Sequence, residues 1–185
     1  PGRPMLHNVL AAALAAARVG APREAIAGAI RDFRGVAHRL ETVGAWGGVT
    51  FVNDSMATIP AATIAALEAF AGRGVVLIAG GQGKGLPLAE VGAAIAERAR
   101  HVVLIGELAD ELGAAIGERV PVERASDMRD AVGRAAAAAR PGDVVLLAPA
   151  AASFDMYTDY AARGDAFRAA AESVGPTLGA AGPHR

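Results

Sequence analysis

The chain has 185 residues, of which 53% are hydrophobic and 20% are charged, and it contains no cysteine. This composition predicts one ordinary globular domain, alone or with a fragment of another attached, and excludes a disordered chain. The lack of cysteine excludes disulfides, thiolate zinc sites and thiol nucleophiles, and the net charge of -1 gives no general electrostatic footprint for nucleic acid.

Nothing in the sequence indicates a membrane segment or a leader. The longest apolar run, over residues 9–17, is about half of the roughly 20 residues that a spanning helix needs. No basic segment followed by an apolar run and a small-residue cleavage site opens the chain. We therefore expect a cytoplasmic protein with no membrane partner and no nucleic-acid partner.

Residues 1–35 are expected to form a short helical hairpin with no strand beside it. The alanine-rich run over residues 11–17 strongly favours helix, and Gly20 ends it. The second helix follows Pro22, which the first turn of a helix tolerates, and its apolar residues recur at helical spacing until Gly35.

From Leu40 onward, short β-rich runs alternate with amphipathic helical patterns. Strands are expected at residues 42–46, 49–52, 75–79, 102–105, 120–122 and 144–147, the first two as a hairpin around Gly47-Gly48. Helices are expected at residues 60–70, 86–99, 108–116, 128–139 and 162–173. This alternation predicts an α/β, Rossmann-like fold with a mostly parallel sheet flanked by helices. The tail from Gly175 is expected to be loose.

Ligands of open α/β sheets bind outside the carboxyl ends of the strands, which directs attention to three turns. The first turn holds Asp54, Ser55 and Thr58. Asp54 is suited to accept ribose hydroxyls, and the two hydroxyl side chains are suited to a carboxylate at a helix N-terminus. The competing interpretation is that these side chains only cap the following helix and order the turn.

The second turn, over residues 80–85, is rich in glycine and holds Lys84, the only lysine among 18 basic residues. It matches neither a P-loop nor the dinucleotide fingerprint, which argues against a dinucleotide-dependent oxidoreductase. A flexible turn that presents one ammonium at a strand end suits a carboxylate or phosphate oxygen. We therefore expect Lys84 to contact a ligand.

The third turn, over residues 148–155, is rich in small residues that let the backbone approach a ligand. Ser153 is expected at a helix start with its hydroxyl and N–H exposed. It is not expected to be a nucleophile, because the glycines of a hydrolase elbow are missing around it. Capping by Ser153 or Asp155 is the alternative. We expect Thr58, Lys84 and Ser153 to converge along one rim of the sheet.

The four histidines lie far apart with no ligand-pair spacing, so we expect no metal site built by this chain. The pair His38-Arg39 falls between the helical hairpin and the first strand, and it is interpreted as a solvated junction rather than an anion site. The pair His7-Asn8, in the first helix, allows the same two interpretations.

Short segments spread over nearly the whole chain form one ordered set. They are His7-Asn8, Phe33-Arg34-Gly35, His38-Arg39-Leu40-Glu41, Asn53-Asp54-Ser55 with Ala57-Thr58, Gly80-Gly81 with Gly83-Lys84, Pro149-Ala150 with Ala152-Ser153-Phe154-Asp155, and Arg163-Gly164. Together and in this order they resemble the end of the Mur ligases, in particular the branch that adds glutamate to UDP-N-acetylmuramoyl-L-alanine in peptidoglycan synthesis.

The resemblance implies an ATP-dependent, amide-forming ligase that uses Mg2+. Such an enzyme converts the substrate carboxylate to an acyl phosphate, which the amine of D-glutamate attacks. Closure of this domain onto the ATPase domain brings the reacting groups together and excludes water from them. The resemblance implies that Arg39 and Asp54 contact ATP. The residues that it implies to line the glutamate are Thr58, Lys84, Ser153, Phe154 and Tyr160.

The resemblance also divides the chain. Residues 1–35 correspond to the helical end of the central ATPase domain, residues 36–175 to the C-terminal glutamate-binding domain, and residues 176–185 to a loose tail. The P-loop, the carbamylated-lysine region and the UDP-binding domain of the family have no counterpart in this sequence. We therefore expect the missing N-terminal and central domains as partners, no catalytic residue in this fragment, and no turnover by the fragment alone.

Three positions depart from the family's pattern. Met56 stands where the D-glutamate branch carries lysine, Ile59 where it carries asparagine, and Ala11 where an asparagine is expected. Loss of a cation costs about 1.5 to 3 kcal/mol for a charge-assisted hydrogen bond unless another group replaces it. Two alternatives therefore stay open: a variant ligase that adds L-glutamate, whose product is epimerised afterwards, and a non-catalytic α/β binding module.

Overall fold

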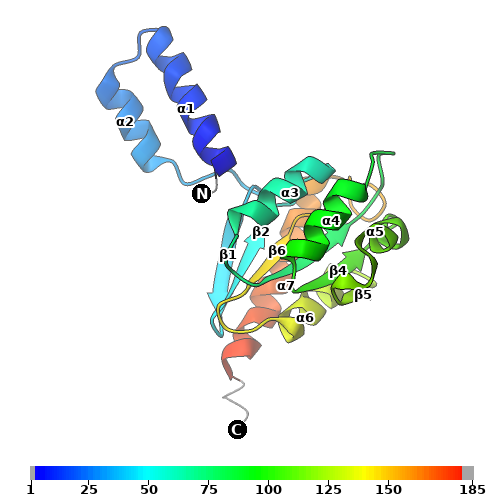
Figure 1. The fold of residues 1–185 in the computed structure, drawn as a ribbon. Coiled ribbons are helices and arrows are strands. Elements are labelled where there is room, and N and C mark those ends of the chain that lie inside the picture. Colours follow the sequence, from blue (N-terminus) through cyan, green and yellow to red (C-terminus); the bar gives the residue numbers. More distant parts are fainter. Residues whose placement is uncertain (1–2, 181–185) are drawn as a thin grey trace.

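The computed structural model describes residues 3–180, which form a six-stranded sheet between two layers of helices, preceded by a helical hairpin (Figure 1). The helices are α1 (Arg3–Arg18), α2 (Arg23–Asp32), α3 (Pro60–Ala69), α4 (Ala89–Arg98), α5 (Ala109–Ile116), α6 (Met128–Ala138) and α7 (Tyr160–Ala180), with a short 3-10 helix at Gly117–Arg119. The strands are β1 (Glu41–Trp46), β2 (Val49–Asn53), β3 (Val75–Gly80), β4 (His101–Ile105), β5 (Val122–Arg124) and β6 (Val144–Leu147).

The strands lie in the order β1-β2-β6-β3-β4-β5. β1 pairs with β2 in antiparallel fashion, and every other neighbouring pair is parallel. The predicted hairpin is confirmed: Trp46 pairs with Val49, and Gly47 and Gly48 make the turn with φ values of +57° and +78°. The α/β class with a mostly parallel, helix-flanked sheet is therefore as the sequence predicted.

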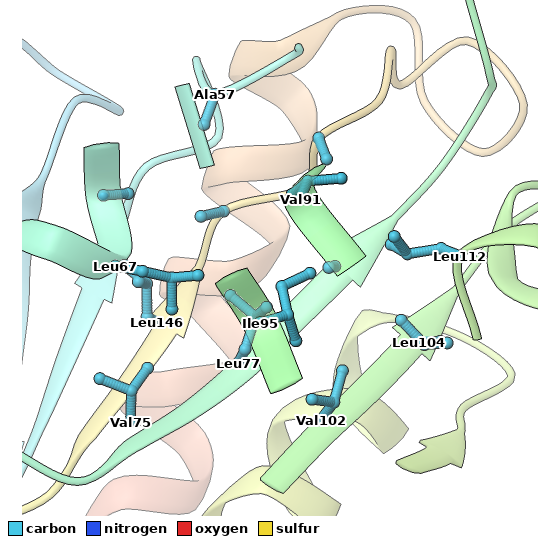
Figure 2. Close-up of a cluster of buried hydrophobic side chains, with 14 of the residues drawn as sticks. Ala57, Leu67, Val75, Leu77, Val91, Ile95, Val102, Leu104, Leu112 and Leu146 are labelled. Atoms are coloured by element: carbon cyan, nitrogen blue, oxygen red, sulfur yellow. The ribbon is translucent and has the colours of Figure 1, made fainter. Parts of the chain in front are cut away.

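Each central strand buries both of its faces, which explains its uninterrupted apolar sequence. In β3, Val75 and Leu77 face the layer formed by α3, α4 and α5. The alternate residues, Val76 and Ile78, face α6 and α7. Figure 2 shows side chains of the first cluster, to which the strands and the three helices α3, α4 and α5 all contribute.

Two elements differ from their expected bounds. The strand expected at residues 120–122 forms at Val122–Arg124, because Val120 is buried against the helical layer rather than within the sheet. The helix expected from residue 86 begins at Ala89, and the preceding residues prolong the turn that follows β3.

The tail expected to be loose from Gly175 is helical as far as Ala180, so that expectation is wrong over these residues. Residues 181–185 lie outside the described residues. The helix is held because Leu178 packs against the apolar cluster between the sheet and the helices α6 and α7, and because the buried Gly175 lies against the indole of Trp46.

The α1–α2 hairpin stands away from the sheet and is joined to β1 by the segment 33–40 (Figure 1). Its apolar side chains are largely uncovered: Leu10 is 57%, Leu14 66% and Phe33 45% exposed. Among the described helices, none has the length and apolar character that crossing a bilayer requires.

We predict that Gly175→Ala lowers the free energy of unfolding by about 1 to 3 kcal/mol, because a Cβ there overlaps the Trp46 indole. The matched control is Gly133→Ala in α6, where a Cβ meets nothing within 4 Å. That variant is expected to keep or raise stability by up to about 1 kcal/mol, since alanine favours helix. Urea unfolding followed by circular dichroism measures both, and equal effects would contradict the packing of α7 on β1.

Candidate functional site

Three turns meet at the carboxyl edge of the sheet. They follow β2, β6 and β3, which are adjacent and parallel in that order, so the turns leave the sheet at the same edge. Main-chain hydrogen bonds join them: Ala150 N donates to Ala57 O (2.9 Å), and Gln82 and Ala152 exchange two bonds of 2.9 Å each. The turn after β6 therefore lies between the other two and connects them.

The guanidinium of Arg163, from the first turns of α7, is buried beneath these turns (1% exposed). Its Nε donates to Ser55 Oγ and its Nη2 to Ser55 O, both at 3.0 Å. Nη1 donates to Ala152 O (3.0 Å), and Nη2 also donates to Ala151 O (3.1 Å). One cation thus binds the turn after β2 to the turn after β6.

Burial lowers the pKa of Arg163 to about 10, and the nearby Asp155 and Tyr157 oppose that decrease. The side chain stays protonated at neutral pH and directs its donors to neutral oxygen atoms, so it belongs to the frame of the site. Gly81 is also part of this frame. Its φ is +130°, which L side chains rarely adopt, and a Cβ at this position would overlap Ala152 O. Sequence analysis had assigned Arg163 no role.

Asp54 and Ser55 do not cap α3. The N-cap is Ile59, and no side chain caps it. Asp54 Oδ1 accepts instead from Leu40 N (3.1 Å), and Ser55 Oγ donates to Tyr160 O (2.7 Å). The capping interpretation is therefore wrong for both residues, whose partners are distant in sequence. Burial raises the pKa of Asp54 to about 6, against the opposing effect of the Leu40 hydrogen bond.

A cavity of about 250 Å³, here called the Arg39 cavity, lies between the segment before β1 and α3. Arg39, Asp54, Met56 and Thr58 are among its lining residues. Two residues expected to contact ATP thus share a cavity with one expected to contact glutamate. Thr58 lines the cavity and does not cap α3, so the capping interpretation is wrong for it too.

A second cavity, here called the Lys84 cavity, has a volume of about 300 Å³ and also borders the start of α3. Lys84, Glu107, Glu111 and Ala150 are among its lining residues. The sequence analysis missed both glutamates. Glu107 follows β4 almost directly, so the strand-end rule that found Lys84 was sufficient to find it.

The position of Ser153 differs from the expectation. No helix starts there, because residues 153–159 form turns in which Met156 N and Tyr157 N both donate to Ser153 O (3.1 and 2.8 Å), and α7 begins at Tyr160. The side chain is buried, with 2% of the residue exposed, so the expected exposed hydroxyl is wrong.

Two aromatic side chains expected to line the glutamate are open to solvent. Phe154 is 67% exposed and Tyr160 41% exposed. The ring of Tyr160 stands edge-on to that of His38, with 6.1 Å between centroids. The structure thus brings the predicted residues to one edge of the molecule, but divides them between two cavities, an exposed aromatic rim and the buried Ser153.

His38 is enclosed by β2 and α7. Its Nδ1 lies 3.0 Å from Asn53 Nδ2, which also donates to Gly164 O (3.2 Å). A Cβ at Gly164 would overlap His38 Nδ1, so the glycine makes room for this ring. The side chain of His38 is 12% exposed. The interpretation of His38-Arg39 as a solvated junction is therefore wrong for His38.

Comparison with known proteins adds a sequence match to this geometry. Residues 38–151 match the Mur ligase, glutamate ligase domain. The chain is 47% identical over 175 residues to the UDP-N-acetylmuramoylalanine–D-glutamate ligase of Solibacter usitatus, covering 95% of this chain and 39% of that relative. The chain spans about two fifths of the length of the curated relatives it matches.

Solved structures share the fold at low sequence identity. The pseudomurein peptide ligase type C of Methanothermus fervidus superposes with a TM-score of 0.66 over 94% of this chain and 36% of that chain, at 16% identity. The folylpolyglutamate synthase of Mycobacterium tuberculosis, complexed with ADP, superposes with a TM-score of 0.53 over 74% of this chain and 32% of that chain, at 22% identity.

We predict that Arg163→Met lowers the free energy of unfolding by about 3 kcal/mol or more, because the buried carbonyl oxygens of Ser55 and Ala151 lose their donors and that of Ala152 keeps only the bond from Gln82 N. The matched control is Arg134→Met, whose guanidinium pairs with carboxylates at the surface. Its expected effect is below about 1 kcal/mol. Urea unfolding measures both variants. Similar decreases in the free energy of unfolding would show that the buried hydrogen bonds of Arg163 contribute no more than a surface ion pair.

We predict that Asp54→Asn raises the free energy of unfolding at neutral pH. The pKa of Asp54 is about 6 in the folded chain and 3.8 ordinarily, so the folded state binds the proton more tightly than the unfolded state does. The free energy of unfolding of the wild type therefore falls as the pH rises from about 3.8 to about 6. The difference between variant and wild type is expected near zero at pH 4, growing to at most about 3 kcal/mol above pH 7. Unfolding titrations between pH 4 and 8 measure it, and a pH-independent difference would contradict the raised pKa.

Proposed function

Because the chain belongs to the Mur ligase family, we propose that it is the C-terminal, glutamate-binding part of an ATP-dependent ligase that joins D-glutamate to UDP-N-acetylmuramoyl-L-alanine. The observation that carries this proposal is the 47% identity, over 95% of this chain, to a relative named for that activity. The grouping of cationic and hydroxyl side chains at one sheet edge supports it.

The proposed division of labour follows from the geometry of the two cavities. At about 250 Å³, the Arg39 cavity lies below the roughly 300 to 1,000 Å³ usual for ligand pockets, so it fits one part of a nucleotide. The guanidinium of Arg39 would bind that part, with Asp54 beside it in the lining of the same cavity. In the Lys84 cavity, the ammonium of Lys84 would bind a carboxylate of the incoming glutamate.

The remaining chemistry belongs, in this proposal, to the rest of a longer protein. A carboxylate oxygen of the acceptor attacks the γ-phosphorus of ATP and ADP leaves. The glutamate amine then attacks the acyl carbon, and phosphate and a proton are released. The position of Phe154 and Tyr160 on the rim suits them to exclude water from this step when the domains close.

Mg2+ would neutralise charge on the transferring phosphoryl group. Within residues 3–180, no group of three or more His, Asp or Glu side chains is placed to hold a metal ion. The residues described here therefore do not fit the ion, and we propose that the rest of the longer protein binds it.

We also propose that residues 1–35 are the helical end of the central ATPase domain and residues 36–175 the glutamate-binding domain. The uncovered apolar side chains of Leu10, Leu14 and Phe33 support the first part, because such a face is suited to pack against a further layer of protein. The tail 176–185 is not a separate unit in its described part, since α7 continues to Ala180.

A specific observation favours one alternative, the addition of L-glutamate. Met56 lines the Arg39 cavity at the position where the D-glutamate branch carries lysine, so the site lacks one cation that ligases for the D-isomer have. The two candidates differ only in the stereochemistry of the amino acid, which makes one assay decisive.

The test is ATP-dependent product formation by the longer protein, with D- and L-glutamate supplied separately and the product identified by mass. Product from D-glutamate supports the proposal, and product from L-glutamate alone supports the alternative. No product from either isomer would overturn both and favour a non-catalytic binding module.

In that assay we predict that Lys84→Ala raises the KM for glutamate by about 10- to 100-fold, the equivalent of one charge-assisted hydrogen bond. The KM for ATP is expected to change less than about threefold. The control is Arg119→Ala, an exposed cation in the short 3-10 helix before β5, which is expected to change neither constant. Equal increases in both constants would contradict the role given to Lys84.

A further inference from the structure

The segment that enters β1 has an uncommon backbone. His38 and Leu40 have φ values of +59° and +45°, although neither is glycine. The left-handed region costs roughly 1 to 2 kcal/mol for an L-residue, so two such residues around Arg39 persist only where neighbouring groups hold them.

Two carboxylates hold them. His38 N donates to Glu41 Oε2 (3.0 Å), and Leu40 N donates to Asp54 Oδ1 (3.1 Å). The carbonyl of His38 accepts from Met56 N (3.1 Å). Both N–H groups that flank Arg39 are therefore bound by side chains, one from β1 and one from the turn after β2.

Each carboxylate is itself anchored to the body of the domain. Glu41 Oε1 accepts from Arg168 Nη2 of α7 (2.6 Å). Burial acts to raise the pKa of Glu41, but the bonds from His38 N and Arg168 outweigh it and the pKa lies below its ordinary value. Asp54 is fixed by its own N–H, which donates to Leu147 O of β6 (2.8 Å).

Arg39 lies where the hairpin and the sheet body meet. It lines the Arg39 cavity and also a cavity of about 430 Å³ formed by α1 and α2, to which Asn8, Ile30 and Phe33 contribute. A backbone free to rotate on either side of Arg39 would let this side chain leave both cavities.

We propose that Glu41 and Asp54 are positioning residues, which fix the left-handed backbone on both sides of Arg39 and thereby keep its guanidinium directed into the nucleotide-binding cavity. The inference rests on the proposed function, because it takes the ligand of Arg39 to be ATP. It assigns Asp54 an action through Leu40 and Arg39, which differs from a direct contact with the nucleotide.

The first arm of the test needs no catalysis. It measures hydrogen exchange of the Leu40 and His38 amides by NMR in this chain. Asp54→Ala is expected to speed exchange at Leu40 at least tenfold, whereas Asp54→Asn, which keeps an acceptor oxygen, restores most of the protection. Glu41→Ala is expected to do the same to His38. Unchanged exchange in both alanine variants would overturn the proposal.

The second arm is a double-mutant cycle in the longer protein, read as the KM for ATP. Asp54→Ala is expected to raise that KM about tenfold when Arg39 is present and less than twofold in an Arg39→Ala background. Asp54→Asn is expected to recover at least half of the loss. Independent, multiplicative effects, or an Asn variant as defective as the Ala variant, would show direct contact and overturn the proposal.

The control is Asp127→Ala, which removes another aspartate that accepts a main-chain N–H, at the N-cap of α6. It is expected to lower stability without changing the KM for ATP, so that a general loss of stability is recognised. If the wild-type longer protein shows no ligase activity, the proposed function fails, and the amide exchange still decides whether the two carboxylates hold the segment.

Discussion

The carboxyl edge of this sheet depends on one buried guanidinium. Within residues 3–180, no main-chain N–H donates to the carbonyl oxygens of Ser55 and Ala151, and Ala151 and Ala152 bring no polar side chain to the turn after β6. Arg163 supplies the missing donors from α7, more than 100 positions away from Ser55 along the chain. A buried cation is costly unless most of its donors are used, and here four of the five N–H groups make hydrogen bonds that compensate for the lost hydration.

Two glycines provide the space that this buried arginine and the neighbouring His38 need. Gly81 lets the turn after β3 approach the Arg163 guanidinium, and Gly164 leaves room for the imidazole of His38. Neighbouring residues of α7 thus organise two different regions: Arg163 binds the turns of the sheet edge, and Gly164 admits the segment that carries Arg39. The pair Arg163-Gly164 is explained by packing, with no need for a contact to substrate.

The fold was predictable because its signal is local. In β3, alternate side chains enter two different apolar layers, so every residue of the run must be apolar and the pattern is visible in five residues. Where a local pattern gave a wrong prediction, the residues concerned pack against a part of the chain that the pattern does not include. Val120 is apolar because it packs outside the sheet, and the helix beyond Gly175 continues because Trp46 and Leu178 hold it.

The position of the candidate site residues was predictable, but their contacts were not. Asp54, Thr58 and Lys84 lie at one edge of the sheet, as expected from parallel strands, which place their carboxyl ends together. The hydrogen-bond partners of the polar side chains could not be predicted, because a polar residue before a helix gives the same sequence pattern whether it caps that helix or binds a distant group. Asp54 binds Leu40 and Ser55 binds Tyr160, and neither pairing leaves a local pattern.

Charge balance in the Lys84 cavity bears on how such a site can work. One lysine and two glutamates, Glu107 and Glu111, give the described lining a formal charge of -1. The proposed substrate, with two carboxylates and one ammonium, carries the same sign, so the field of this lining alone disfavours its entry. Cations from outside this cavity would therefore strengthen binding. In the proposed ligase these would come with domain closure, which ties capture of the amino acid to assembly of the complete active site.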